Sequence, residues 1–163
     1  MDVQLRHADT HQLAEISPLV AAYHACEQIP SNASARESAI AQLLGDRQLG
    51  GLWLVTVDDK TAGYIALCRG FSLEFNGFDA FIDEFFLLPE FRGRGVGKIV
   101  LAEIKRLAAA LGINALHLEV ARDNQPARNL YASAGFQARD KYLLMSLPVN
   151  QQPASNNIED SNQ

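Results

Sequence analysis

The sequence has little of several features that would place the protein in a specialised class. No apolar run approaches the ~18 residues of a transmembrane helix, so we expect no membrane span. Positive charge is not in excess, because 14 Lys and Arg residues are set against 19 Asp and Glu residues and the net charge is −5. A net-negative chain is a poor general nucleic-acid binder, so we expect no nucleic-acid partner.

Cysteine and metal-ligand patterns are equally sparse. The two cysteines, Cys26 and Cys68, form no paired framework, which is typical of free thiols in a reducing compartment. The four histidines are not spaced like metal ligands, so we predict no metal site. The first residues, MDVQLRHADT, lack a basic region followed by an apolar one. We therefore expect no secretory leader and a cytoplasmic protein.

What is present predicts one domain of the mixed α/β (α+β) class. A chain of 163 residues, 48% hydrophobic and 20% charged, is long enough for one core. Apolar and alternating runs predict strands over residues 3–6, 51–57, 62–71, 79–88 and 115–121, and a final strand pair or one bent strand over 136–147. Caps and helical spacing predict helices that begin at Asp9 or Thr10, at Ser34 with a capping box to Glu37, after the glycines at 93–97, and at Pro126. We predict a domain over 1–148 and a disordered polar tail over 149–163.

The stretch FRGRGVGK, residues 91–98, places three glycines at alternate positions among cations, between a predicted strand and a predicted helix. Glycine lets successive backbone N–H groups turn toward one point. A helix N-terminus adds free N–H groups and the positive end of the helix dipole. Together with the charges of Arg92, Arg94 and Lys98, these features predict a phosphate-binding loop.

Two familiar phosphate loops do not fit this stretch. The nucleotide P-loop needs a hydroxyl residue after its lysine, but Ile99 follows Lys98. The dinucleotide fingerprint, read from Gly93, needs a glycine where Lys98 stands. A nucleotide-binding module is therefore a disfavoured prediction.

A third pattern fits. The hexapeptide from Arg92 to Gly97 matches [Q/R]-x-x-G-x-[G/A], a loop that binds the pyrophosphate of acyl-CoA. Downstream, the pattern N-x-x-A-x-x-L-Y-x-x-x-G-F is matched by Asn124, Ala127, Leu130, Tyr131, Gly135 and Phe136. In these motifs, and in their separation by one helix and one strand, the chain resembles the GCN5-related N-acetyltransferase (GNAT) family over at least residues 52–147. The resemblance implies a mixed sheet of six to seven strands, splayed at its centre and flanked by about four helices.

The resemblance also implies acetyl-CoA as the cosubstrate. The loop would bind the pyrophosphate, the strand before it would lie along the pantetheine arm, and the start of the last helix would border the far side. The implied cofactor-binding residues are Phe85, Phe86, Leu87, Arg92, Gly93, Arg94, Gly95, Val96, Gly97, Lys98, Asn124 and Ala127. We nominate the backbone N–H of Leu87 or Leu88 to meet the developing oxyanion.

Three side chains are candidate catalytic groups. Asp83 and Glu84 stand in an otherwise apolar strand, where alternation would send one side chain to each face. The family's working carboxylate matches Asp83, which we favour as base or amine-binding group, with Glu84 second. Tyr131 is the candidate acid for the departing thiolate. The acids Glu27, Glu74 and Asp79 would line an acidic mouth or remain ordinary surface residues.

The predicted function is an acetyl-CoA-dependent N-acetyltransferase that acts on a primary amine of a small cationic, polyamine-like molecule. A protein N-terminus or lysine is the alternative acceptor. A CoA-binding sensor without turnover belongs to a different class, and the presence of Asp83, Glu84 and Tyr131 argues against it. A homodimer is a further expectation.

Overall fold

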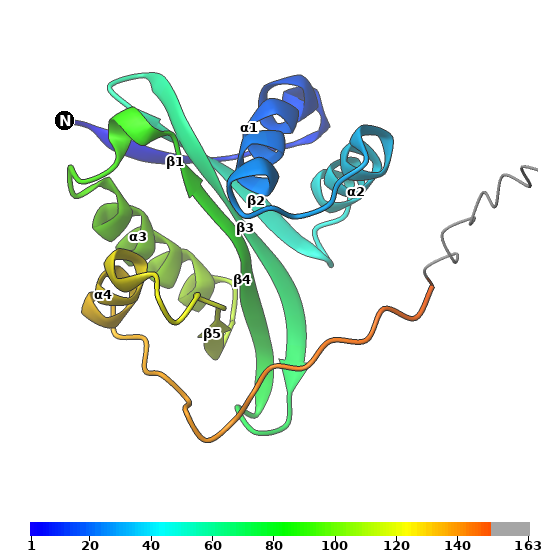
Figure 1. Ribbon diagram of the computed structural model, residues 1–163, viewed down its shortest axis with the longest axis vertical. Coiled ribbons are helices and arrows are strands. Elements are labelled where there is room, and N and C mark those ends of the chain that lie inside the picture. The colour runs from blue at the N-terminus through cyan, green and yellow to red at the C-terminus, as the bar shows by residue number, and fades with distance from the viewer. Residues whose placement is uncertain (151–163) are drawn as a thin grey trace, which may run out of the picture.

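A single sheet forms the centre of the computed structural model, which describes residues 1–150 (Figure 1). Its strands are β1 (Val3–His7), β2 (Gly50–Val57), β3 (Lys60–Ser72), β4 (Gly77–Leu87) and β5 (Ala115–His117). They lie in the order β1-β2-β3-β4-β5, with β1 to β4 antiparallel and β5 parallel to β4. Within the described residues the sheet has five strands, fewer than the six to seven expected.

Helices cover both faces of this sheet (Figure 1). Helices α1 (Leu13–Cys26) and α2 (Ala33–Gly45) pack on one face, against apolar side chains that include Leu52, Leu54 and Ala66. Helices α3 (Val96–Ala110) and α4 (Gln125–Ser133) lie on the other face, where α3 packs on Val55, Ile65 and Ile82. Short 3-10 turns, η1 (Thr10–Gln12) and η2 (Pro89–Phe91), precede α1 and follow β4. The mixed α/β class predicted from the sequence is confirmed.

Tight turns set the order of the antiparallel strands. Asp58 and Asp59 both have positive φ, 48° and 63°, between β2 and β3, and Asn76 has φ 56° before β4. Asn and Asp tolerate this left-handed region better than most residues, which is why such pairs mark hairpins. These residues therefore allow the chain to reverse between neighbouring antiparallel strands.

The parallel pair β4 and β5 opens soon after it forms. Pairing runs from Asp79 with Ala115 to Phe81 with His117, and stops there. Strand β4 continues to Leu87, so its edge toward β5 has no strand partner beyond Phe81 in the described chain. The sheet is therefore splayed next to the loop that begins α3, as expected.

Several boundaries differ from the predictions. Helix α2 begins at Ala33, because the Asn32 side chain caps it by accepting a hydrogen bond from the Ala35 N–H at 3.1 Å, and Ser34 lies inside it. Strand β5 ends at His117 instead of residue 121. No strand forms over 136–147, where Leu143, Met145 and Leu147 are exposed. Most of the predicted tail, residues 151–163, lies outside the described residues.

Within residues 1–150, no helix has both the length and the apolar character needed to cross a bilayer.

Candidate active site

The glycine loop has the geometry of an anion site. Gly93 and Gly95 adopt φ values of 69° and 83°, a left-handed region that favours glycine. Gly95 is the N-cap of α3, and its carbonyl accepts the N–H of Lys98 at 3.1 Å. Within residues 1–150, the backbone N–H groups from Gly93 to Gly97 have no hydrogen-bond acceptor in the loop or elsewhere. Free N–H groups at a helix start attract anions such as phosphate.

The loop opens onto a cavity of about 790 Å³ between α1, β4, α3 and α4. This volume lies within the ~300–1,000 Å³ range of small-molecule and cofactor sites. Of the residues predicted to bind the cofactor, those that line the cavity are Phe85, Phe86, Leu87, Arg92, Gly93, Gly95, Gly97, Lys98, Asn124 and Ala127. Arg94 and Val96 do not line it.

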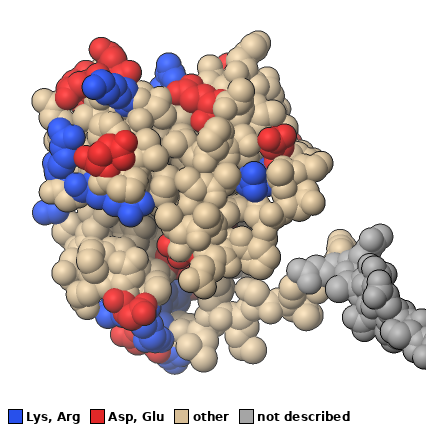
Figure 2. All heavy atoms as spheres, turned by 45° about the horizontal axis from the view of Figure 1, so that its top comes forward, with Lys and Arg blue, Asp and Glu red and all other residues tan. Residues whose placement is uncertain are grey.

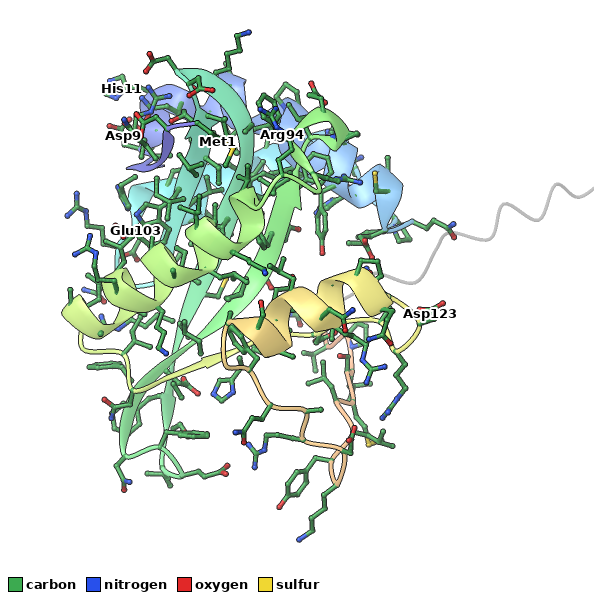
Figure 3. The ribbon with its side chains drawn as sticks, turned by 90° about the vertical axis from the view of Figure 1, so that its left-hand side faces the viewer. Met1, Asp9, His11, Arg94, Glu103 and Asp123 are labelled. Carbon is green, nitrogen blue, oxygen red and sulfur yellow. The ribbon has the colours of Figure 1, made fainter. Side chains whose placement is uncertain are left out.

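Arg94 and Val96 have other positions. The Val96 side chain is buried in the core beneath α3, and the Arg94 guanidinium lies 6.0 Å from the centre of the Phe91 ring. Figure 3 shows Arg94 at the start of α3 and Asp123 at the start of α4. Any contact of Val96 with a phosphate would therefore come from its backbone N–H.

Helix α4 is capped by its own first residues and packs closely on the start of α3. Asn124 is its N-cap, and the Asn124 side chain accepts the N–H of Ala127 at 3.2 Å. Gly97 leaves room for Leu130, since a Cβ at Gly97 would lie 2.9 Å from the Leu130 Cδ2. The downstream motif therefore shapes the cavity wall through capping and close packing.

Arg92 closes the strand end of the cavity. Its Nε donates to the Leu87 carbonyl at 2.7 Å, and its guanidinium lies 5.3 Å from the centre of the Phe86 ring. The Leu88 N–H donates to the Ala62 carbonyl at 2.8 Å, so it is engaged within the sheet. Of the two backbone N–H groups nominated to meet the oxyanion, that of Leu87 therefore remains the candidate.

Asp83 and Glu84 do not alternate across the sheet. Leu67 pairs with Ile82 and Ala66 pairs with Glu84, so Asp83 is an extra residue in β4, a β-bulge. Glu84 is opposite Ala66, which packs under α1 and α2, and the charge of Asp83 acts on Tyr23 and Tyr64 on that same side, so both carboxylates lie on the α1 face. The prediction that they point to opposite faces is wrong, because strict alternation assumed an unbroken register.

Glu84 is held by side chains from two other elements. The Tyr64 hydroxyl of β3 donates to Glu84 Oε2 at 2.6 Å, and His24 Nε2 of α1 lies 2.6 Å from Glu84 Oε1. We call these three residues the Glu84 clamp. Sequence reasoning missed His24 and Tyr64, since no local pattern signals contacts between positions 60 and 20 residues apart.

Asp83 lies beside the clamp without being part of it. Its side chain keeps contact with solvent, yet partial burial of the carboxyl group and, second, the charge of Glu84 raise its pKa. Neither Asp83 nor Glu84 lines the cavity, but the charges of both act on Tyr23, which does. The two acids therefore lie near the cavity without lining it.

Tyr131 lines the cavity on α4, as predicted. Burial and, second, the charge of Glu27 raise the pKa of its hydroxyl. Glu27, at the end of α1, lines the same cavity. A phenol with a raised pKa stays protonated to higher pH, which suits a proton donor.

Of the three acids expected either to line an acidic mouth or to remain surface residues, one lines the cavity. Glu74 pairs with Arg139 at 2.8 Å, and Asp79 lies 3.2 Å from His117 Nε2, so neither lines the cavity. Glu27 does. On the face drawn in Figure 2, acidic and basic side chains are interspersed, without a field of one sign. Attraction of a cation would therefore depend on a few local carboxylates.

No group of three or more His, Cys, Asp or Glu side chains in residues 1–150 could hold a metal ion.

Comparisons with known proteins bear on the same segment. The model of the acetyltransferase (GNAT) family matches residues 16–136. A human spermidine/spermine N(1)-acetyltransferase-like protein is 28% identical over 142 residues, which is 81% of this chain and 20% of that protein. An aminoglycoside N(6')-acetyltransferase type 1 from Salmonella typhimurium is 25% identical over 99 residues, 52% of this chain and 68% of that protein.

Among solved structures, an integron cassette protein from the mobile metagenome of Cole Harbour Salt Marsh has the same fold. Its TM-score is 0.79 and its sequence identity is 30%, with 91% of this chain and 92% of that chain covered. This chain spans about a fifth of the length of the human relative.

Proposed function

The chain belongs to the acetyltransferase (GNAT) family, and we propose that it transfers the acetyl group of acetyl-CoA to a primary amine of a small cationic, polyamine-like molecule. One observation carries this proposal. The unengaged N–H groups of Gly93 to Gly97 open onto the same cavity that Tyr131 and Glu27 line. Acetyl-CoA with its pyrophosphate at the loop would thus extend its acyl arm toward the titratable side chains of Tyr131 and Glu27.

In the proposed reaction the loop binds the pyrophosphate, and β4 from Phe85 to Leu87 lies along the pantetheine arm. A neutral amine nitrogen attacks the thioester carbonyl carbon, and the carbonyl π bond opens to an oxyanion. The Leu87 N–H donates to that oxyanion. The carbon–sulfur bond then breaks, Tyr131 protonates the thiolate, and a β4 carboxylate receives the proton that the amine loses. The products are an acetylated amine and free CoA.

A cationic acceptor is supported by the charges around the opening. Glu27 and Tyr23 line the cavity, and the charges of Glu27, Glu84 and Asp83 all act on Tyr23. Tyr23 lines the cavity beside Glu27, and an aromatic ring next to carboxylates is a favourable surface for an ammonium group. The two relatives above carry names of amine-acetylating enzymes, for polyamines and for aminoglycosides.

The test is a panel of acceptors with release of free thiol as the readout. The panel pairs each diamine or polyamine with its monoacetylated form and with the matching alcohol, and adds peptides with free N-termini or lysines. We expect the highest kcat/KM for an acceptor with two or more ammonium groups. Faster turnover of a peptide would move the acceptor to the protein class, and acetyl-CoA binding without turnover would indicate a sensor.

The cytoplasmic location, the homodimer, the domain limits at 1–148 and the absence of metal, membrane and nucleic-acid partners stay predictions. Light scattering coupled to size exclusion would measure the oligomeric state.

A further inference from the structure

Tyr23 connects the Glu84 clamp to the cavity. It belongs to α1, which also carries His24, and it lines the cavity together with Phe86 of β4. The centre of its ring lies 6.0 Å from that of His24, 6.5 Å from that of Tyr64 and 6.1 Å from that of Phe86. These are ordinary separations for packed aromatic rings. The Tyr23 ring is therefore held by two members of the clamp as well as by the cavity wall.

The Tyr23 hydroxyl has no partner inside the described protein. None of the side-chain hydrogen bonds formed within residues 1–150 involves it, whereas the neighbouring Tyr64 hydroxyl donates to Glu84 Oε2 at 2.6 Å. A tyrosine hydroxyl can both donate and accept hydrogen bonds. Because Tyr23 is half-buried and lines the cavity, its hydroxyl is available to a molecule bound there.

The same hydroxyl lies near the groups that the proposed reaction uses. The side chains whose charges act on it are Glu27, Glu84, Tyr131 and Asp83. They include the proposed proton donor on α4 and the carboxylates of β4, one of which would receive the amine proton. A reacting amine has to be near both, which places it beside Tyr23.

The protonation state of Tyr23 limits what its hydroxyl can do. Burial and, second, the charge of Glu27 raise the pKa of Tyr23 to about 12. A phenol with such a pKa keeps its proton at neutral and moderately alkaline pH. Its oxygen can therefore accept a hydrogen bond from an amine, but the hydroxyl is not the base that removes the amine proton.

On the basis of the proposed function, we infer that Tyr23 positions the acceptor nitrogen and selects primary amines over secondary amines. A neutral primary amine has two N–H groups. As its lone pair attacks the thioester carbon, one N–H bond breaks and its proton passes to a β4 carboxylate. The other N–H donates a hydrogen bond to the Tyr23 oxygen. A secondary amine has a single N–H, so it cannot serve the carboxylate and Tyr23 together.

The selection follows from the cost of an unpaired polar group. An N-methyl group turned toward the Tyr23 oxygen would replace the hydrogen bond and would also keep water from that oxygen. A site that hydrogen-bonds an N–H of its substrate rejects the analogue without it, because the polar group of the site is then left unpaired. Tyr23 is thus a specificity-determining residue, and the packing of its ring fixes the position of its hydroxyl.

The first experiment compares the wild type with Tyr23→Phe on two substrates. One is the best acceptor of the panel, and the other is the same acceptor with one methyl group on each primary nitrogen. Tyr23→Phe keeps the ring and removes the hydroxyl. We expect kcat/KM for the primary amine to fall about tenfold, the value of one hydrogen bond, and kcat/KM for the methylated amine to change little. The preference for the primary amine should therefore fall about tenfold as well.

The ratio of the two kcat/KM values isolates the hydrogen bond. Comparing this ratio between two enzymes cancels the difference in intrinsic reactivity of the two amines. A purely structural role of the hydroxyl would lower kcat/KM for both substrates alike and leave the ratio unchanged. An unchanged ratio in Tyr23→Phe would overturn the inference.

Tyr64→Phe is the matched control, because it removes the hydroxyl of a neighbouring tyrosine that does not line the cavity. Its hydroxyl serves Glu84, so its loss should affect both amines alike and leave the ratio at the wild-type value. An equal fall of the ratio in Tyr64→Phe and Tyr23→Phe would assign the selection to the clamp and overturn the role of Tyr23. Tyr142→Phe, in an exposed segment, should behave like the wild type.

Calorimetric titration with acetyl-CoA separates the acceptor from the cosubstrate. Tyr23→Phe leaves the loop from Gly93 to Gly97 unaltered, so the affinity for acetyl-CoA should not change. A loss of that affinity as large as the loss in kcat/KM would assign Tyr23 to the cosubstrate site and overturn the inference. A wild type that acetylates no amine would overturn the proposed function as well. An active wild type whose preference is the same in Tyr23→Phe would overturn this inference alone.

Discussion

Gly97 of α3 lies directly under Leu130 of α4, and a Cβ at Gly97 would come within 2.9 Å of the Leu130 Cδ2. Gly97 is buried, and both residues line the cavity. The distance between the two helices, and with it the width of the cavity, thus depends on the absence of a side chain at Gly97.

Gly97→Ala should push Leu130 out of place. We expect a loss of about 1 kcal/mol in the free energy of unfolding, at the low end for overpacking because Leu130 can change rotamer, together with weaker acetyl-CoA binding. Gly45→Ala is the control, because a Cβ there would meet its nearest atom at 4.0 Å. Chemical denaturation and calorimetric titration measure the two quantities. An unchanged affinity for acetyl-CoA in Gly97→Ala would show that the packing of Leu130 on Gly97 does not affect acetyl-CoA binding.

Gly95→Glu should abolish acetyl-CoA binding. The substitution places a carboxylate at the N-cap of α3, where the proposed phosphate would lie. The negative charges of the carboxylate and the phosphate would repel each other. Gly112→Glu is matched, since Gly112 also has positive φ, 72°, and open space around it, but follows the other end of α3. Calorimetry on both folded variants separates charge from backbone strain. Equal affinity in the two would contradict the phosphate assignment of the loop.

Tyr131→Phe should lose turnover with little change in acetyl-CoA affinity. The ring keeps its packing against Phe136, 5.9 Å away between ring centres, while the hydroxyl is removed. A loss of about 10²–10⁴-fold in kcat is the usual range for a general acid. Tyr142→Phe, in an exposed segment outside the cavity, is the control. Steady-state kinetics with a thiol reagent that detects free CoA measure kcat. A wild-type kcat in Tyr131→Phe would mean that Tyr131 serves packing alone.

Glu27→Gln should change the basic side of the pH profile. Burial and then the charge of Glu27 raise the pKa of Tyr131. An acid is competent below its pKa, so kcat falls as the pH rises through that value. Removing the charge lowers the pKa of Tyr131, and the fall should begin at lower pH. A basic limb that does not move would mean that Tyr131 is not the proton donor, or that Glu27 acts through substrate binding alone, which a raised KM for the amine would reveal.

The glycine loop, the downstream motif and the mixed fold could be predicted from the sequence because each depends on local chemistry. A positive φ at Gly93 and Gly95 favours glycine. Asn124 caps α4 by accepting the N–H of Ala127, three residues further along the chain. The cofactor residues followed from the motif, and most of them line one cavity. Spacing along the chain was enough for all of these.

The predictions that were wrong depended on partners distant in the chain. A strand over 136–147 was predicted from its apolar pattern, but a strand exists only where a neighbour pairs with it. The sequence also left open whether Glu27, Glu74 and Asp79 line an acidic mouth or remain surface residues, because the partner of Glu74, Arg139, is 65 residues away. Contacts of this range leave no trace in a local pattern.

The sequence by itself determined that a glycine loop begins a helix, that two acids stand together in an apolar strand, and that a tyrosine follows in a helix with a family motif. Only the tertiary structure decided how the two acids are placed. One extra residue in β4 turned Asp83 and Glu84 to the same face, and α1 and β3 brought His24 and Tyr64 to Glu84 alone. The physical reason is that register and packing depend on the whole sheet, while motifs and turns depend on neighbours in the chain.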